Sequence, residues 1–458
     1  MIAPELLSPA GTRRAMDYAF AYGADAVYAG QPRYSLRVRE NEFNKLDVMA
    51  EAVAQAHSLG KKFYIASNIA PHNSKVRTYL KNMEPVIDMQ PDALIMSDPG
   101  LIMMVRQRWP EMPIHLSVQA NAVNYATVRF WQQQGLSRII LSRELSIPEI
   151  AEIRQECPDM ELEVFVHGAL CIAYSGRCLL SGYMNHRDSN QGACTNACRW
   201  NYSINEAEQT IEGDIQLKIL NPEPNSSSCC SSTDAPPEDR VFLLEEPNRP
   251  GEFMPVFEDE HGTYIMNSRD LRAVEHVPEF VRMGLASLKI EGRTKTYFYA
   301  ARTAQVYRQA IDAAIRGEPI DAKLLANLDT LANRGYTDGF YSRRPISELQ
   351  NYEVGHSTSQ RQLFVGDVIG REGDFLVVDV KNRFELGDQL ELMTPSGNIQ
   401  FVLEHLFDRK GQPVSVAPGS KHIVRVPIPE TLRHSLSEHD LQFALMTRFL
   451  PASSPIPV

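Results

Sequence analysis

The sequence lacks any long apolar run. None of its 458 residues lies in a stretch that approaches the roughly 18 consecutive apolar residues of a membrane-spanning helix. The first residues, MIAPELLSPAG, have neither the basic start nor the apolar centre of a secretory signal. We therefore expect a cytoplasmic protein with no membrane partner. In such a reducing compartment, clustered cysteines are more often metal ligands or catalytic groups than disulfides.

Motifs of the common hydrolase and nucleotide-binding classes are also missing. The chain contains no HExxH, no GxSxG and no GxxxxGK[ST], so zinc-protease, α/β-hydrolase and P-loop chemistry have no support. Cysteine is scarce, with seven residues, yet four of the seven fall within 28 positions. Cys157 stands alone before a proline, and we expect it in the core or at a helix end. The functional argument therefore rests on the cluster of four.

Charge is distributed unevenly along the chain. The formal net charge is −11, and residues 201–260 alone hold 14 Asp and Glu against 3 Lys and Arg. The segment from position 289 to 308 has five basic residues and a single acidic one, Glu291. The basic residues are Lys289, Arg293, Lys295, Arg302 and Arg308. They form either a basic surface for nucleic acid or the solvated charges of a helix.

Short apolar runs alternate with amphipathic segments over the first 300 residues. Eight of the runs are typical of strands buried on both faces. They are PELLS, DAVYAG, KFYIAS, ALIMS, IHLSV, RIILS, ELEVFV and ASLKI. Helical patterns such as TRRAMDYAFAYG lie between most of them. This order predicts an α/β fold with a (β/α)₈ TIM-barrel-like domain, and a doubly wound open sheet is the alternative.

The residues that follow the predicted strands are polar. Examples are Asn68 after KFYIAS, Arg143 after RIILS, His167 after ELEVFV, and Glu291 with Arg293 after ASLKI. A barrel of this kind collects its functional groups at the carboxyl ends of its strands. We therefore expect the functional site at that end of the barrel.

The chain divides into three predicted regions. The catalytic barrel domain covers residues 1–318, and it contains a cysteine-rich insertion at 163–200 and an acidic flexible segment at 203–250. Residues 319–360 are predicted to form a helical linker. Residues 361–450 alternate apolar and polar positions between Gly-Asp turns, which predicts a small antiparallel β-barrel domain.

The four clustered cysteines have the spacing C-x6-C-x15-C-x3-C. They are Cys171, Cys178, Cys194 and Cys198. Four thiolates in so short a segment suit an iron–sulfur cluster or a zinc ion, although zinc ribbons prefer two tight pairs. Unligated cysteines are a third interpretation. In a fourth, Cys171 is a nucleophile with His167 or His186 as its base.

A family signature surrounds the first two of these cysteines. The run EVFVHGALCIAYSGRCLLS, residues 163–181, resembles the signature of the collagenase-like peptidase family, family U thirty-two. That signature is Glu-x-Phe, two residues, Gly-Ala-Leu-Cys, four residues and Gly-x-Cys-x-Leu-Ser, and every specified position is present. The blocks PELLSPAG, GADAVYAG, MNSRDL and SLKIEGR are also similar to family blocks. The resemblance therefore spans about residues 3–310.

The resemblance implies an activity that the family name does not describe. It implies hydroxylation of the wobble uridine of tRNA to 5-hydroxyuridine. It also implies that the reaction does not use molecular oxygen in the way that a flavin or haem enzyme does. It also implies prephenate, a dicarboxylate, as co-substrate and a [4Fe-4S] cluster. The implied cluster ligands are Cys171, Cys178, Cys194 and Cys198. The rival functions are a cysteine-type peptidase, hydroxylation of ribosomal RNA, and an RNA-binding assembly factor without catalysis.

Several polar residues become candidates for the reaction under this interpretation. Lys289 and Glu291 alternate along the eighth strand end, which places them on the same side, and we predict that they handle protons and orient the substrate. His167 is predicted to donate to the substrate or to cluster sulfur. The structural alternative for each is a salt bridge at the barrel rim or a buried, satisfied histidine.

Binding groups can be assigned from charge and ring chemistry. Arginine forks bind carboxylates in a bidentate manner, and the candidates are Arg143, Arg177, Arg269 and Arg293. Trp200 is predicted to stack on a flipped base, with core packing as its alternative. Lys295 and Arg302 are predicted to contact RNA phosphate.

Overall fold

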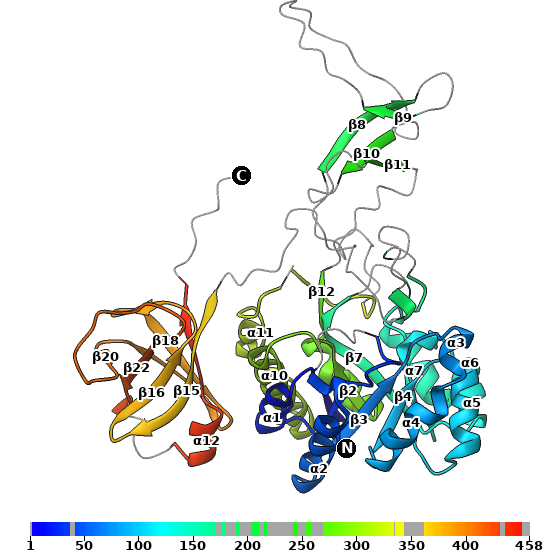
Figure 1. Cartoon of the computed structure of the whole chain (residues 1–458), viewed down its shortest axis with the longest axis horizontal. Helices are drawn as coiled ribbons and strands as arrows, with labels where there is room; N and C mark the ends of the chain where they lie inside the picture. The colour runs from blue at the N-terminus through cyan, green and yellow to red at the C-terminus, as the bar shows by residue number, and fades with distance from the viewer. Residues whose placement is uncertain are drawn as a thin grey trace, which may run out of the picture.

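The computed structural model describes most of the chain. The described residues are 2–36, 42–170, 174, 176–178, 181, 189–191, 203–209, 215–217, 241–245, 253–257, 269–333, 335–342, 361–430 and 436–450. A barrel forms from the N-terminal part of the chain, and an antiparallel sheet domain forms from the C-terminal part (Figure 1).

Eight parallel strands close into the barrel. They are β1 (Glu5–Pro9), β2 (Ala26–Gly30), β3 (Lys62–Ser67), β4 (Ala93–Met96), β5 (Ile114–Leu116), β6 (Arg138–Ile140), β7 (Glu161–Ala169) and β13 (Ser287–Ile290). The barrel closes because β13 pairs with both β7 and β1. Each predicted apolar run overlaps one of these strands. The TIM-barrel-like fold is therefore confirmed, and the open-sheet alternative is wrong.

Helices cover the outside of the barrel. They are α1 (Arg13–Ala21), α2 (Leu46–Ser58), α3 (Asn73–Val76), α4 (Tyr79–Asp88), α5 (Pro99–Arg108), α6 (Tyr125–Gln133), α7 (Ile147–Glu156), α9 (Val277–Met283) and α10 (Tyr297–Arg316). Three of them begin at the caps Thr12, Asp98 and Asn124, whose side chains accept a backbone N–H three residues later. Within the described ranges, no helix combines the length and the apolar character needed to cross a bilayer.

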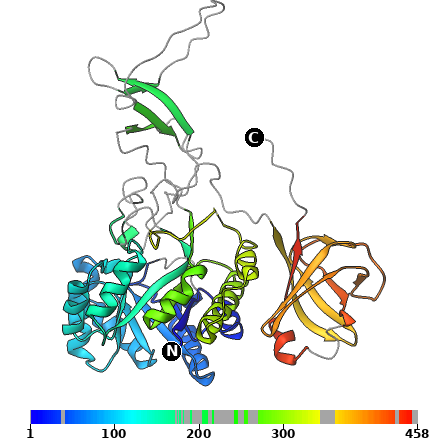
Figure 2. The ribbon, with the colours of Figure 1, turned by 180° about the vertical axis from the view of Figure 1, so that it is seen from behind.

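The segment after β7 departs from the barrel repeat. The short strand β12 (Asp270–Arg272) runs antiparallel to the end of β7, with Leu271 opposite Gly168, and β14 (Tyr336–Thr337) pairs with β12. A separate antiparallel sheet contains β8 (Ser203–Gln209), β9 (Ile215–Leu217), β10 (Val241–Glu245) and β11 (Phe253–Phe257). It lies beyond β12 in both views (Figure 2). These strands lie in and just after the segment predicted as an acidic flexible insertion, whose residues 221–240 are outside the described ranges.

The C-terminal sheet domain, residues 362–449, is antiparallel as predicted. Its seven-stranded sheet has the order β19-β18-β23-β15-β16-β22-β20. These strands are β15 (Gln362–Glu372), β16 (Phe375–Val380), β18 (Gln389–Thr394), β19 (Gly397–Val402), β20 (Phe407–Asp408), β22 (Ile423–Pro427) and β23 (Leu445–Phe449). The helix α12 (Glu438–Gln442) precedes β23, and α11 (Ala322–Leu328) lies between α10 and β14.

Buried polar contacts join the sheet domain to α1 and α10. Arg302 of α10 is fully buried and forms an ion pair with Glu391 of β18. The side chains of Gln305 and Asn398 exchange two hydrogen bonds of 2.9 and 3.1 Å. The hydroxyl of Tyr22 donates to the backbone carbonyls of Met393 and Phe443 on the facing domain. This interface fixes the sheet domain on the barrel wall.

Candidate functional site at the barrel mouth

A buried ion pair lies inside the barrel. The Nζ atom of Lys289 on β13 is 2.9 Å from Oε1 of Glu163 on β7, and both side chains are almost fully buried. The same amine lies 4.2 Å from the ring centroid of Tyr28 on β2. Burial lowers the pKa of Lys289, and the Glu163 carboxylate acts in the opposite direction. Lys289 therefore forms the salt bridge of its structural alternative, although inside the barrel and not at the rim, and its part in the reaction stays a prediction.

Glu291 stands directly after β13, at the mouth. Its Oε2 atom accepts a 3.0 Å hydrogen bond from the Tyr28 hydroxyl, so Lys289 and Glu291 share one neighbour, as their alternation predicts. Its backbone carbonyl lies so near Gly168 that a Cβ atom there would be 2.5 Å from the oxygen, and Gly168 has φ +108. Glycine at 168 therefore lets β7 approach the Glu291 turn closely.

Arg138 extends the charged interior toward the amino ends of the strands. Its Nη1 atom lies 2.6 Å from Glu5 and 3.2 Å from Glu163, and its Nε atom lies 2.8 Å from Glu161. The interior of a TIM barrel is normally filled with branched apolar side chains. Sequence reasoning missed both Arg138 and Glu163. The available signal was a charged residue at an alternating position within an otherwise apolar, buried run.

Arg143 reaches the mouth from the end of β6. Its Nη1 atom donates to the carbonyl of Ala169 at 2.8 Å, and its guanidinium carbon lies 3.9 Å from the ring centroid of Phe165. Its Nη2 atom is 4.0 Å from Oε2 of Glu291. Among the described residues, its buried Nε atom has no hydrogen-bond partner.

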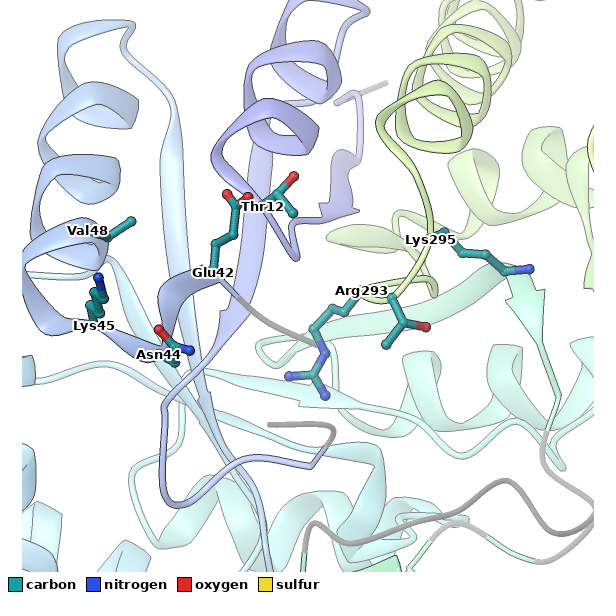
Figure 3. Close-up of a pocket in the computed structure, with 8 residues that line it drawn as sticks. Thr12, Glu42, Asn44, Lys45, Val48, Arg293 and Lys295 are labelled. Carbon is teal, nitrogen blue, oxygen red and sulfur yellow. The ribbon is translucent and has the colours of Figure 1, made fainter. Parts of the chain in front are cut away.

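Arg293 lines a pocket at the rim, where the ends of β13, β1 and β2 meet. Its Nη2 atom donates to the carbonyl of Leu36 at 2.9 Å, and its guanidinium lies 5.6 Å from the Tyr28 ring centroid. The pocket has a volume of about 650 Å³. Its other lining residues are Thr12, Glu42, Asn44, Lys45, Val48, Thr294 and Lys295. Figure 3 shows Arg293 and Lys295 leaving the same turn in different directions.

The other two predicted arginines lie in the cysteine segment and beside β12. Arg177 is exposed beside Cys178, and its backbone N–H donates to the Tyr174 carbonyl at 3.0 Å. Arg269 directly precedes β12, and its buried Nε atom lacks a hydrogen-bond partner in the described part of the chain. Their roles as carboxylate ligands stay predictions.

His167 is packed among aromatic rings. It is 1% exposed, and its ring lies between 5.5 and 5.8 Å, centroid to centroid, from the rings of Tyr299, Tyr307 and Tyr336. Its Nδ1 atom is 3.3 Å from the Tyr307 hydroxyl. Burial lowers the pKa of His167 to about 3, so the ring is neutral near pH 7. These contacts give it a packing role, and donation to substrate or sulfur stays a prediction.

Cys178 is the one predicted cluster ligand within the described ranges. Its carbonyl accepts hydrogen bonds from Ser189 Oγ at 2.7 Å and Asn190 Nδ2 at 3.2 Å. The carbonyl of Asn190 accepts from the N–H of Ala70, which follows β3. Gly176, with φ +72, lies against the backbone of Gln119, which follows β5. The cysteine segment therefore rests on the carboxyl ends of β3 and β5.

The position of this cysteine fits a cluster at the mouth. Cys171, Cys194 and Cys198 lie outside the described residues, as do Trp200 and His186. Within the described part, no three potential metal ligands come together. The donor chemistry still fits, because four thiolates are the usual ligand set of an iron–sulfur cluster. Cys157, by contrast, is buried at the end of α7 with its Sγ atom 3.7 Å from the Tyr125 carbonyl, which confirms its predicted structural place.

The basic segment does not form one surface. Lys289 and Arg302 are buried, and Arg308 forms ion pairs with Asp25 at 3.0 Å and Asp312 at 2.8 Å. The prediction that Arg302 contacts RNA phosphate is wrong, because the side chain is enclosed between α10 and the sheet domain and paired with Glu391. Arg293 and Lys295 are the members of this segment that line the mouth pocket.

Family comparisons agree with the signature around the cysteines. The description "Peptidase family U32" matches residues 11–351, and "Peptidase family U32 C-terminal domain" matches residues 360–438. This chain belongs to peptidase family U32. The resemblance seen in the sequence is therefore confirmed.

Relatives of this U32 chain include proteins named for RNA hydroxylation. The tRNA hydroxylation protein P of Escherichia coli (strain K12) is 60% identical over 454 residues, which are 98% of this chain and 97% of that protein. The 23S rRNA 5-hydroxycytidine synthase of the same organism is 28% identical over 400 residues, 85% of this chain and 52% of that protein. The solved C-terminal domain of a Geobacillus thermoleovorans U32 protein is 24% identical, covers 19% of this chain and 92% of its own, and gives a TM-score of 0.16.

Proposed function

We propose that this protein hydroxylates the wobble uridine of tRNA to 5-hydroxyuridine in the cytoplasm, with a [4Fe-4S] cluster and prephenate. The observation that carries the proposal is 60% identity over 98% of the chain to a tRNA hydroxylation protein. The rRNA-modifying relative supports RNA hydroxylation in general, but this chain covers only 52% of its length. The alignment with the tRNA hydroxylation protein covers 98% of this chain and 97% of that protein, which favours tRNA over ribosomal RNA as the substrate.

The cluster would be held by Cys171, Cys178, Cys194 and Cys198. When bound, such a cluster supplies single-electron transfer. The contacts of the Cys178 segment with the ends of β3 and β5 support a place above the mouth. Thiolates committed to iron are poor nucleophiles, which disfavours the peptidase alternative.

Arginines at the mouth would bind the carboxylates of the co-substrate. Arg143 and Arg293 are each held by one backbone carbonyl, at 2.8 and 2.9 Å, which fixes the orientation of the guanidinium. Glu291 accepts from Tyr28 and lies within 4.0 Å of Arg143, so it is the carboxylate placed to take a proton at the mouth. Lys289 orients this group through the shared Tyr28.

The proposal is tested by nucleoside mass spectrometry of tRNA. Cells without the protein should lack 5-hydroxyuridine, and the wild-type gene should restore it. Cys178→Ala should fail to restore it, whereas Cys157→Ala, which removes a buried cysteine away from the mouth, should succeed. Normal 5-hydroxyuridine in cells without the protein contradicts the proposal, and loss of a ribosomal RNA modification instead supports the rRNA alternative.

The cluster is tested on protein purified without oxygen. We expect about four iron and four sulfide per chain and a brown colour. Cys178→Ala should lose both, and Cys229→Ala, at one of the two adjacent cysteines in the acidic segment, should keep them. Stoichiometric zinc without iron contradicts the cluster, and peptidase activity that survives metal removal supports the peptidase alternative.

A further inference from the structure

A groove of about 800 Å³ lies between α11 and the C-terminal sheet domain. Its walls are α11, the first residue of β15, strands β18 and β19, and the end of β23. This volume is in the range of natural small-ligand sites. The groove is separate from the mouth pocket, with which it shares no lining residue.

We propose that this groove binds an unpaired segment of the RNA substrate, with base contacts inside and phosphate contacts at its lip. The inference rests on the proposed function, since it assigns the same RNA a second contact on the enzyme.

Amide and aromatic side chains give the groove its chemistry. Asn327 of α11 and Gln400 of β19 present both donors and acceptors, which match the edges of nucleobases. Phe449, half-buried at the end of β23, offers a ring on which an unpaired base can stack. Single-stranded RNA is commonly recognised by this combination of stacking and amide contacts.

Positive charge lies at the exposed lip. Lys323 of α11 and Arg361 beside β15 are both exposed. The acidic side chain that lines the groove is Glu391, and the buried Arg302 guanidinium neutralises it. Lys323 therefore gives the lip a positive charge that attracts phosphate, whereas Arg361 also lies 3.7 Å from the Asp329 carboxylate.

The groove is preformed by the domain interface. Arg302 pairs with Glu391 at its floor, and the Gln305–Asn398 side-chain pair holds β19 against α10. A ligand therefore meets walls that are already fixed, which lowers the entropic cost of binding.

The groove is linked to the mouth side of the barrel through Asp329. This carboxylate lies 3.7 Å from Arg361 at the groove and 2.6 Å from Arg272 of β12. Strand β12 pairs with the end of β7, two residues before Cys171. In Figure 1, α11 and the facing ends of β15 and β23 are at the same end of the molecule as β12. One RNA chain can thus contact the groove while its target base is at the mouth.

The test measures binding of tRNA and of a short unpaired oligouridine by fluorescence anisotropy across a salt series. Lys323→Glu should lower the slope of log affinity against log salt by about one, the effect of one lost phosphate contact. Phe449→Leu should weaken binding about tenfold, and Phe449→Tyr should restore it, because stacking needs the ring. Lys410→Glu, the same charge change on an exposed site outside the groove, is the matched control. Melting temperatures identify variants that fail to fold.

The inference is overturned if Lys323→Glu and Phe449→Leu both bind RNA with the affinity of the wild type at every salt concentration. The groove would then bind another class of ligand, such as a peptide. Failure of Phe449→Tyr to restore binding by a folded protein also overturns the stacking role. Formation of 5-hydroxyuridine by the wild type, measured on the same preparations, tells whether the proposed function stands independently of the groove.

Discussion

Arg143 and Arg293 illustrate how single side chains shape the mouth. Each donates one guanidinium N–H to a backbone carbonyl, to Ala169 and Leu36 respectively, and each lies near an aromatic ring. A guanidinium held in this way loses little further freedom when it binds a carboxylate. The planar shape of the guanidinium group, and not its charge alone, should therefore determine the affinity for a carboxylate ligand.

Replacing Arg293 with lysine tests this point, because the charge is kept and the fork is lost. We expect the KM for prephenate to rise roughly 10- to 150-fold, which corresponds to about 1.5–3 kcal/mol for a hydrogen bond to a charged group. The melting temperature should change little. Arg33→Lys, an exposed neighbour, is the control. Unchanged kinetics in Arg293→Lys would show that this strand end is structural.

His167 predicts a specific pH dependence of stability. Its pKa is about 3 in the folded protein because of burial, and about 6.5 in an unfolded chain. As the pH falls through this window, the unfolded chain binds a proton that the folded protein does not, so the free energy of unfolding falls by up to about 1.4 kcal/mol per pH unit. In urea titrations, the stability advantage of wild type over His167→Gln should shrink between about pH 6 and pH 4. A constant advantage would contradict a buried neutral ring.

At the scale of elements, β7 and β13 are joined by a charge pair as well as by backbone hydrogen bonds. Glu163→Gln would leave Lys289 buried without its carboxylate, and we expect a loss of about 3–5 kcal/mol in the free energy of unfolding. Glu161→Gln, on the same strand and also paired with Arg138, should cost at most about 1 kcal/mol, because the Glu161 side chain is 53% exposed. Denaturant unfolding of both variants is the measurement, and equal losses would refute the distinction.

The strands of the barrel were predictable because a strand that is buried on both faces appears in the sequence as a short, nearly continuous apolar run. ELEVFV and ASLKI are apolar apart from Glu161, Ser287 and the two residues that form the interior ion pair. The order of strands and helices then fixed the barrel and the end at which Glu291, Arg143 and Arg293 appear. Alternation along β13 also predicted that Lys289 and Glu291 share a side.

The depth and partners of charged residues were not predictable from local patterns. Whether Lys289 points to the rim or the interior depends on Glu163, which is 126 positions away in the chain. Arg302 lies in a helix of ordinary amphipathic composition, and its partner Glu391 is 89 positions away on another domain. The basic run therefore predicted that Arg302 belongs to an exposed surface for nucleic acid, whereas packing against the sheet domain buries this side chain.

At the scale of the whole molecule, the interface between barrel and sheet domain contains the buried pair Arg302–Glu391. Either Arg302→Met or Glu391→Met should destabilise the protein by about 3–5 kcal/mol, because one charge stays buried alone. The double variant should recover most of this loss. The exposed pair Arg383–Glu385 gives the control cycle, in which the two losses should be additive because solvent screens the pair. Calorimetry of each cycle is the measurement, and additive losses at the interface would disprove the coupling.

Closure of the barrel also determines when its strands can pair during translation. Glu5 of β1 pairs with Ser287 of β13, so this edge of the first barrel strand to be translated has no barrel neighbour until the last barrel strand emerges. Open strand edges favour aggregation of a nascent chain. The sheet domain, translated afterwards, then packs across α1 and α10, the helices that follow those two strands. The sheet domain thus secures the junction between the first and last barrel strands, and a chain that terminates before this domain leaves that junction open.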